Sequence, residues 1–174
     1  MNILEFLQLS AGHWFSQRTI HNLGSEELIT GKSELDWEIL PVNDPAVVQL
    51  CQLYQRDVAT ATLGMRITWD GTPGRDQPKQ KGATLWVSIL DTNNDHQAEI
   101  LVEPTRQDNR LMKCHASLGK DEVLTLITDA QDLQVEERLW YLMPNLRVRS
   151  SIVKQSNQFT HASFYSEIRM GVKK

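Results

Sequence analysis

Apolar and polar residues alternate over much of the chain with a period of two. The clearest stretch is residues 62–70, where Leu63, Met65, Ile67 and Trp69 alternate with small or polar residues. Successive side chains of a β-strand point to opposite faces, so this period predicts a strand with one buried face. Segments of the same kind lie at residues 14–20, 33–40, 83–90, 98–105, 110–117, 122–129, 135–143, 145–153 and 159–170.

Two other segments have the spacing of helices. Residues 2–10 place apolar side chains at helical intervals and are followed by Gly12 as a stop. In the second segment Asp44 can cap the first turn, and Pro45 suits the first helical position, where a backbone N–H is not needed. We therefore expect an N-terminal helix and a second helix near residues 44–56.

Many short strands joined by short polar links are typical of an antiparallel meander. A meander of roughly eight to ten strands commonly closes into a barrel, because closure removes exposed strand edges. A barrel of this size can enclose one small ligand. An open sandwich is the alternative arrangement. We expect a mainly β fold, an antiparallel barrel formed by residues 1–174 as a single domain.

Composition and charge exclude several classes of function. The net charge of −4 argues against nucleic acid as the main partner. No apolar run approaches the roughly 20 residues of a membrane helix, and the N-terminus lacks a cationic leader, so we expect neither membrane insertion nor a signal peptide. The two cysteines, Cys51 and Cys114, indicate no disulfide framework and fit a cytoplasmic location.

Common catalytic motifs are absent from the sequence, and its five histidines are scattered, so no metal site is expected. What stands out is a set of charged residues within apolar strand segments. Three polar side chains share one face of residues 145–153, and single charged side chains share a face with apolar neighbours elsewhere. These residues are Arg147, Arg149 and Ser151, and then Arg18, Glu137 and Glu167.

Two interpretations of these charges remain open at this point. On a solvated outer face, the arginines need no partner. On the inner face of a barrel, an unpaired arginine would cost several kcal/mol and would need a carboxylate. Glu137 could serve, and so could the carboxylates of a ligand, because a planar guanidinium binds carboxylates through parallel hydrogen bonds.

Four segments carry a resemblance to a known family. They are LSAGHWFSQRT, MRITWDGT, VEERLWYLMPNLRVRSSIVK and ASFYSEIRMG, and they occur in the family's order and at its spacing. The sequence resembles the S/U-type phycobiliprotein lyases, the CpcS/CpeS family of cyanobacteria and related algae, from about residue 1 to 172.

The resemblance implies a lipocalin-like calycin barrel of about ten strands that binds an open-chain tetrapyrrole, phycocyanobilin or phycoerythrobilin, as substrate and holds no tightly bound cofactor. It implies attachment of the bilin, with phycocyanobilin preferred, by a thioether bond to a cysteine of phycobiliprotein subunits: allophycocyanin, phycocyanin β or phycoerythrin. A non-catalytic bilin carrier, or an accessory subunit of a heterodimeric lyase, is the alternative. An unrelated lipocalin-like carrier of another acidic ligand is a third. The resemblance leaves open whether the protein acts alone, as a homodimer or as a heterodimer.

The same resemblance implies roles for individual residues. Glu137 matches the carboxylate that accepts pyrrole N–H bonds and helps to move a proton, whereas the nucleophile is the acceptor's own cysteine. The implied bilin contacts are Arg147 and Arg149 at the propionates with Arg18 as a third basic contact, Met65 and Trp69 on the ring faces, and Ser151 and Glu167 in the pocket wall.

The sequence departs from the family pattern after WDGT. Related sequences often continue with an acidic residue and a second tryptophan, but here Pro73, Gly74 and Arg75 follow. This departure argues against a ring contact from that loop.

Overall fold

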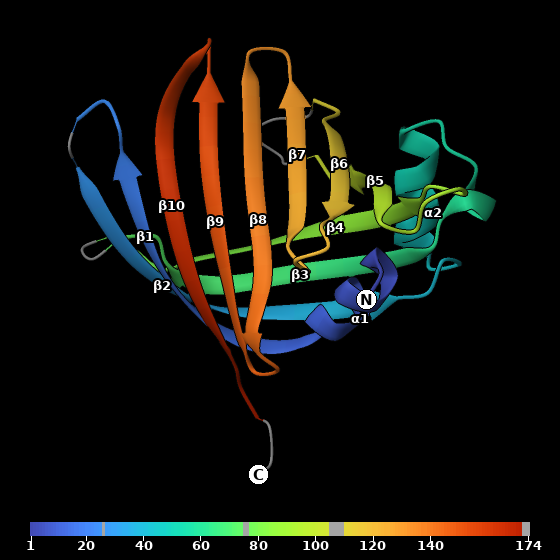
Figure 1. Cartoon of the computed structure of the whole chain (residues 1–174), viewed down its shortest axis with the longest axis horizontal. Coiled ribbons are helices and arrows are strands. Elements are labelled where there is room, and N and C mark those ends of the chain that lie inside the picture. The colour runs from blue at the N-terminus through green and yellow to red at the C-terminus, as the bar shows by residue number, and fades with distance from the viewer. Residues whose placement is uncertain (26, 75–76, 105–109, 172–174) are drawn as a thin grey trace.

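The strands close into a barrel (Figure 1). The computed structural model describes residues 1–25, 27–74, 77–104 and 110–171. Its strands follow the antiparallel order β1-β10-β9-β8-β7-β6-β5-β4-β3-β2, and β2 pairs with β1 to close the ring. The strands are β1 (Gly12–Asn22), β2 (Leu28–Leu40), β3 (Leu63–Thr72), β4 (Gln80–Leu90), β5 (Gln97–Val102), β6 (Lys113–Leu118), β7 (Leu124–Ala130), β8 (Leu133–Met143), β9 (Leu146–Gln155) and β10 (Gln158–Arg169). The expected mainly β barrel is confirmed.

The period-two pattern arises because each strand turns one row of side chains into the barrel. Inward residues of neighbouring strands pair across the sheet, as Met65 pairs with Trp86 and Leu126 with Glu137. The interior is packed mainly with aliphatic and aromatic side chains, so the alternation in the sequence reflects burial on one face.

The helix α1 (Ile3–Ser10) packs into one end of the barrel, beside the end of β8 (Figure 1). Asn2 and Glu5 form a capping box at its start. Phe6 contacts the ring of Tyr141 with centroids 5.2 Å apart. At the end of the helix Arg169 of β10 donates hydrogen bonds to the carbonyls of Leu9 and Ala11, which ties the last strand to the first helix.

The helix α2 (Pro45–Leu53) covers the outer face of the sheet, and the 3-10 turn η1 (Val58–Thr60) follows it. Asp44 accepts a hydrogen bond from the backbone N–H of Ala46, and Pro45 begins the helix, as the sequence predicts. The buried residues Val47, Leu50 and Cys51 pack against Leu40, Leu85, Val87 and Leu101 of the strands below. This second apolar layer explains why both faces of some strands carry apolar residues.

The polar stretch at residues 71–82 is shorter as a loop than the sequence suggests. Strand β3 continues to Thr72 and β4 begins at Gln80, with Pro73 and Gly74 in the link between them. Arg75, the third residue of the family departure, lies outside the described residues. No described helix combines the length and apolar character that crossing a bilayer requires.

Candidate functional site

The charged residues singled out by the sequence point into the barrel. Arg18 pairs with Tyr165, which pairs with Arg149, and Arg149 pairs with the buried Leu139. The same register places Met65, Trp69, Glu137, Arg147, Ser151 and Glu167 on inward positions. The choice between a solvated outer face and an inner face is therefore settled in favour of the inner face.

The neighbours of Glu137 on its own strand show the contrast. Glu136 and Arg138 lie on the outer face of β8, where Arg138 Nε donates to Glu136 Oε1 over 2.9 Å. Both side chains are well exposed. Such a pair contributes little to stability, because water solvates both charges.

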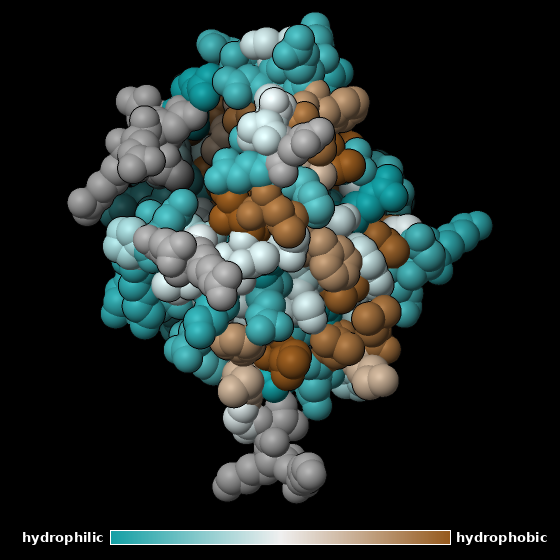
Figure 2. Space-filling view, turned by 90° about the vertical axis from the view of Figure 1, so that its left-hand side faces the viewer, coloured by the Kyte–Doolittle hydropathy of each residue, from teal (hydrophilic) through white to brown (hydrophobic). Residues whose placement is uncertain are grey.

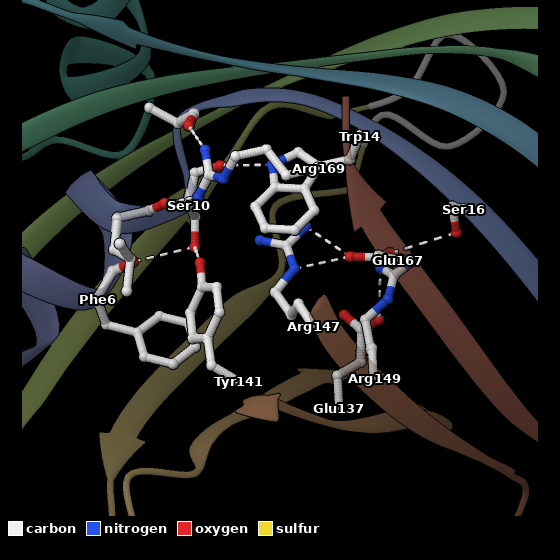
Figure 3. Close-up of polar contacts among 12 residues, drawn as sticks. Phe6, Ser10, Trp14, Ser16, Glu137, Tyr141, Arg147, Arg149, Glu167 and Arg169 are labelled. Atoms are coloured by element: carbon white, nitrogen blue, oxygen red, sulfur yellow. Dashed lines mark hydrogen bonds and ion pairs between the residues drawn. The ribbon is translucent and has the colours of Figure 1, made fainter. Parts of the chain in front are cut away.

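Arg147 and Glu167 form a fully buried ion pair (Figure 3). Arg147 Nε donates to Glu167 Oε2 over 2.7 Å, and Arg147 Nη2 lies 2.5 Å from the same oxygen. The terminal nitrogens of Arg147 complete no hydrogen bond with the described residues. Its guanidinium instead lies over two indole rings, 4.5 Å from the centroid of Trp14 and 4.4 Å from that of Trp37. The charge of Arg147 is thus compensated within the protein.

Arg149 has looser partners than Arg147. Its Nη1 lies 3.4 Å from Glu137 Oε1 and its Nη2 lies 3.5 Å from Glu167 Oε1, and the guanidinium lies 3.9 Å from the ring centroid of Tyr165. Burial opposes the charged form of Arg149, but the carboxylates of Glu167 and Glu137 outweigh it and raise the pKa of Arg149 above its usual value. Arg149 therefore remains a cation with long, weak contacts, which a ligand carboxylate can replace.

A cavity of about 260 Å³ lies inside the barrel next to Arg149. Its wall combines aromatic, aliphatic and hydroxyl side chains with two arginines. The side chains that define its character are Trp37, Trp69, Trp86, Tyr165, Arg18 and Arg149. Of the residues implied by the family resemblance, Arg18, Trp69 and Arg149 line this cavity. Glu137 does not line it but accepts a hydrogen bond from Arg149.

The remaining implied contacts lie deeper in the packing. Met65 is 1% exposed and belongs to the apolar core, and Ser151 is buried beside Glu137 on the neighbouring strand. Arg147 and Glu167 are paired with each other. None of these four residues lines the cavity. Their roles as bilin contacts stay predictions.

Three residues of the cavity wall carry hydrogen-bond donors that have no acceptor among the described residues. The Nε atoms of Arg18 and Arg149 and the indole Nε1 of Trp37 are buried, and none donates to any described residue. No carboxylate among the described residues lies within ion-pair distance of Arg18. Unsatisfied buried donors are uncommon in folded proteins because they lose water without gaining a partner. Because Arg18, Arg149 and Trp37 all line one cavity, its chemistry favours a ligand that carries acceptor oxygens.

Sequence reasoning missed the aromatic part of this wall. Trp37, Trp86 and Tyr165 occupy inward positions of strands, where an aromatic residue usually belongs to the core. The period-two pattern favours inward positions for them but could not show that they line a cavity. The presence of a cavity depends on which strands face each other across the barrel.

A larger but open groove of about 590 Å³ lies on the outer face of β1, β2 and β10. Its side chains are mostly polar, including Gln17, Thr30, Lys32 and Ser166, with Phe164 at one side. Arg18 borders both this groove and the interior cavity. Figure 2 views this side of the molecule, where hydrophobic patches are interrupted by hydrophilic residues. The groove lacks the enclosure and the aromatic walls typical of small-molecule sites, so the interior cavity is the stronger candidate.

Neither cysteine of the chain is placed to act as a nucleophile. Cys51 and Cys114 are free and buried, the former on the buried face of α2 and the latter in the interior. Burial raises the pKa of the Cys114 thiol to about 11. A thiol with so high a pKa is almost entirely protonated at neutral pH and is a poor nucleophile.

The raised pKa of Cys114 predicts a loss of stability in alkali. The folded protein holds the proton more tightly than the unfolded chain, so the stabilisation is complete below the ordinary thiol pKa of 9.0 and declines as the pH rises through about 11. Relative to a Cys114→Ala variant, the free energy of unfolding should fall by up to about 3 kcal/mol between pH 8 and 12. Urea titrations at several pH values measure this, and parallel pH profiles for the two proteins would contradict it.

Comparisons with known proteins agree with the geometry. A family model described as CpeS-like protein matches residues 2–170. A protein of Thermosynechococcus vestitus named chromophore lyase CpcS/CpeS is 45% identical over 172 residues, covering 99% of this chain and 94% of that protein. A phycocyanobilin lyase subunit CpcS of Picosynechococcus sp. is 31% identical over 168 residues, covering 95% and 85% of the two chains.

A solved structure shows the same fold. The S-type phycobiliprotein lyase CPES from Guillardia theta matches with a TM-score of 0.85 and 25% sequence identity, over 99% of this chain and 95% of that chain. The sequence matches and the structural match each extend over nearly the whole chain. The chain belongs to the CpeS-like protein family.

Proposed function

We propose that this protein is a chromophore lyase that binds an open-chain tetrapyrrole in its barrel and attaches it by a thioether bond to a cysteine of a phycobiliprotein subunit. The names of its relatives as chromophore lyases support the activity. Phycocyanobilin is the proposed bilin and phycoerythrobilin the alternative, since relatives are named for each. The proposed acceptors are allophycocyanin, phycocyanin β and phycoerythrin subunits, and the proposed setting is the cytoplasm.

The observation that carries the proposal is the pair of incompletely partnered arginines in an aromatic cavity. A bilin has two propionates on its inner rings and a flat conjugated system. Arg18 and Arg149 supply cationic donors for the propionates, and Trp69 supplies a face for a ring. Arg147, by contrast, already has the carboxylate of Glu167. We therefore assign the propionate contacts to Arg18 and Arg149 and a supporting role to Arg147.

The chemistry is an addition with no leaving group. The acceptor thiolate attacks the ethylidene carbon of ring A, a carbon–sulfur bond forms, and a proton is taken up by the conjugated system. The protein contributes orientation and proton transfer. Glu137 is the proposed proton-handling group, because its side chain is 23% exposed and contacts Arg149 at the edge of the cavity.

A reconstituted transfer assay tests this proposal. Protein, phycocyanobilin and an apo-phycobiliprotein subunit are mixed, and covalent colour that survives acid denaturation is compared with the spontaneous level. If the protein is a lyase, we expect more adduct, at the correct cysteine. Bilin binding without added adduct, even with a second family member present, would support a carrier or an accessory subunit. Absence of bilin binding would contradict the proposal.

Glu137→Gln should separate binding from transfer. The amide keeps the shape of the side chain but cannot exchange a proton, so we expect the bilin Kd to change little and the rate of adduct formation to fall by roughly 100-fold. Stopped-flow absorbance with saturating bilin measures the rate. Glu136→Gln is the matched control on the outer face and should leave both quantities unchanged. Normal transfer by the Glu137 variant would remove Glu137 from the mechanism.

A further inference from the structure

Trp37 lines the cavity and carries a hydrogen-bond donor that the contacts assigned so far do not use. Its indole is 4% exposed and lines the cavity, and its Nε1 is buried without an acceptor among the described residues. An indole N–H can only donate, so only an acceptor atom can satisfy it. By comparison, Trp14 of the same core donates its Nε1 to the carbonyl of Ser10 over 3.0 Å.

The ring of Trp37 is held in place from two sides. The guanidinium of Arg147 lies 4.4 Å from its ring centroid, and the ring of Trp86 meets it edge-on, with centroids 5.5 Å apart and an interplanar angle of 82°. Arg147 is in turn fixed by Glu167. The donor is therefore pre-organised, and an acceptor that meets it does not have to order the ring.

Trp37 lies at the closed end of the barrel, whereas Arg18 lies farther toward the other end. Trp37 pairs with Gly12, the residue that begins β1 directly after α1. Arg18 is six residues later on β1 and pairs with Gly31, so the two backbone positions are about 20 Å apart along the strands. Both side chains nevertheless line the same cavity. The cavity thus has a cationic end and the indole of Trp37 at greater depth.

This arrangement matches the order of polar groups along a bilin. The propionates are on the two inner rings, and each terminal ring carries a lactam carbonyl. If the propionates lie at Arg18 and Arg149, one terminal ring extends toward Trp37 at the closed end of the barrel. The other terminal ring extends toward the opposite end, the mouth. Ring A must be at the mouth, because the acceptor cysteine belongs to another protein. The ring that reaches Trp37 is then ring D.

We propose that Trp37 donates a hydrogen bond from its indole Nε1 to the lactam carbonyl oxygen of ring D, and so sets which end of the bilin enters the barrel. This inference rests on the proposed function, since it takes a bilin as the ligand. It adds a residue that determines the orientation of the substrate. The inference also assigns a structural role to Arg147 and Glu167, because they hold the indole that contacts ring D.

The test removes the N–H without changing the shape of the ring. Trp37 is replaced by benzothienylalanine, in which sulfur stands in place of the indole nitrogen. The same replacement at Trp86 is the matched control. Trp86 lines the same cavity, and its Nε1 is not among the buried atoms without a partner. At position 37 we expect the Kd for phycocyanobilin to rise roughly five- to tenfold, as for the loss of one hydrogen bond. At position 86 we expect less than a twofold change.

A spectroscopic measurement separates a direct contact from a general loss of packing. With phycocyanobilin carrying ¹⁸O in the ring D carbonyl, the isotope-sensitive infrared band should move to higher frequency when the N–H at position 37 is removed. An unchanged band with an unchanged Kd would overturn the role of Trp37 while leaving bilin binding by the native protein intact. If the native protein binds no bilin, the proposed function and this inference both fail.

Discussion

Glu167→Gln should lower the free energy of unfolding by roughly 3–5 kcal/mol, because it leaves a buried cation without its carboxylate. Arg147 is 0% exposed, and Glu167 is its ion-pair partner among the described residues. The two indoles stabilise the guanidinium but carry no compensating charge. Equilibrium urea denaturation followed by circular dichroism measures the loss.

Glu136→Gln is the control for this prediction. Glu136 is also paired with an arginine, but the pair is exposed on the outer face of β8, so we expect a cost below about 1 kcal/mol. A combined Arg147→Met and Glu167→Leu variant should recover part of the loss, since apolar groups of similar volume avoid a buried charge. A cost for Glu167→Gln as small as that of the control would contradict a structural ion pair.

Arg18→Ala should weaken the binding of phycocyanobilin by roughly 10- to 150-fold without destabilising the fold. A hydrogen bond to a charged partner is worth about 1.5–3 kcal/mol, which corresponds to this range of Kd. Arg18 has no ion-pair partner among the described residues, and its Nε is buried without an acceptor, so its removal breaks no contact on which the barrel depends. Absorbance or fluorescence titration gives the Kd.

Two controls make this result specific. Lys32→Ala removes a positive charge from the outer groove on the neighbouring strand and should leave the Kd unchanged. The dimethyl ester of the bilin lacks the carboxylate charges, so native protein and Arg18→Ala should bind it about equally. Equal binding of the free acid by both proteins would remove Arg18 from the site, and weaker binding by Lys32→Ala would point to the outer groove.

The fold could be predicted from the sequence because its main determinant is local. The alternation of Leu63, Met65, Ile67 and Trp69 requires only that one face of a strand is buried, and the helix signals at Asp44 and Pro45 act within one turn. The extent of β2 was harder to predict. Residues 28–32 show little alternation and become a strand because β1 pairs with them along its length.

The site was predicted less completely, for a physical reason that Arg147 and Arg149 illustrate. The two residues are two positions apart on one face of β9, so the sequence pattern treats them alike. Their environments differ because other strands supply Trp14, Trp37 and Glu167 around Arg147, whereas Arg149 contacts the edge of the cavity. Such differences depend on register across the whole barrel, which a local pattern does not contain.

The residues that the family resemblance names all face inward. The resemblance could not show which of them line the cavity and which are packed in the core. Arg18, Trp69 and Arg149 line the cavity, while Met65 and Ser151 are packed behind it. Trp37 is not among the contacts that the resemblance implies, and the sequence pattern alone gives no reason to add it, since an inward tryptophan in an apolar strand is usually a core residue. Its unsatisfied N–H became visible only once the surrounding side chains were placed.

A crystal structure of the complex with phycocyanobilin is the most direct test of the central claim, that the barrel interior holds the bilin through Arg18 and Arg149. We expect propionate oxygens within hydrogen-bond distance of both guanidinium groups, ring D beside Trp37 and ring A at the mouth. A bilin located in the outer groove near Lys32 and Phe164, with the interior side chains unmoved, would contradict the claim.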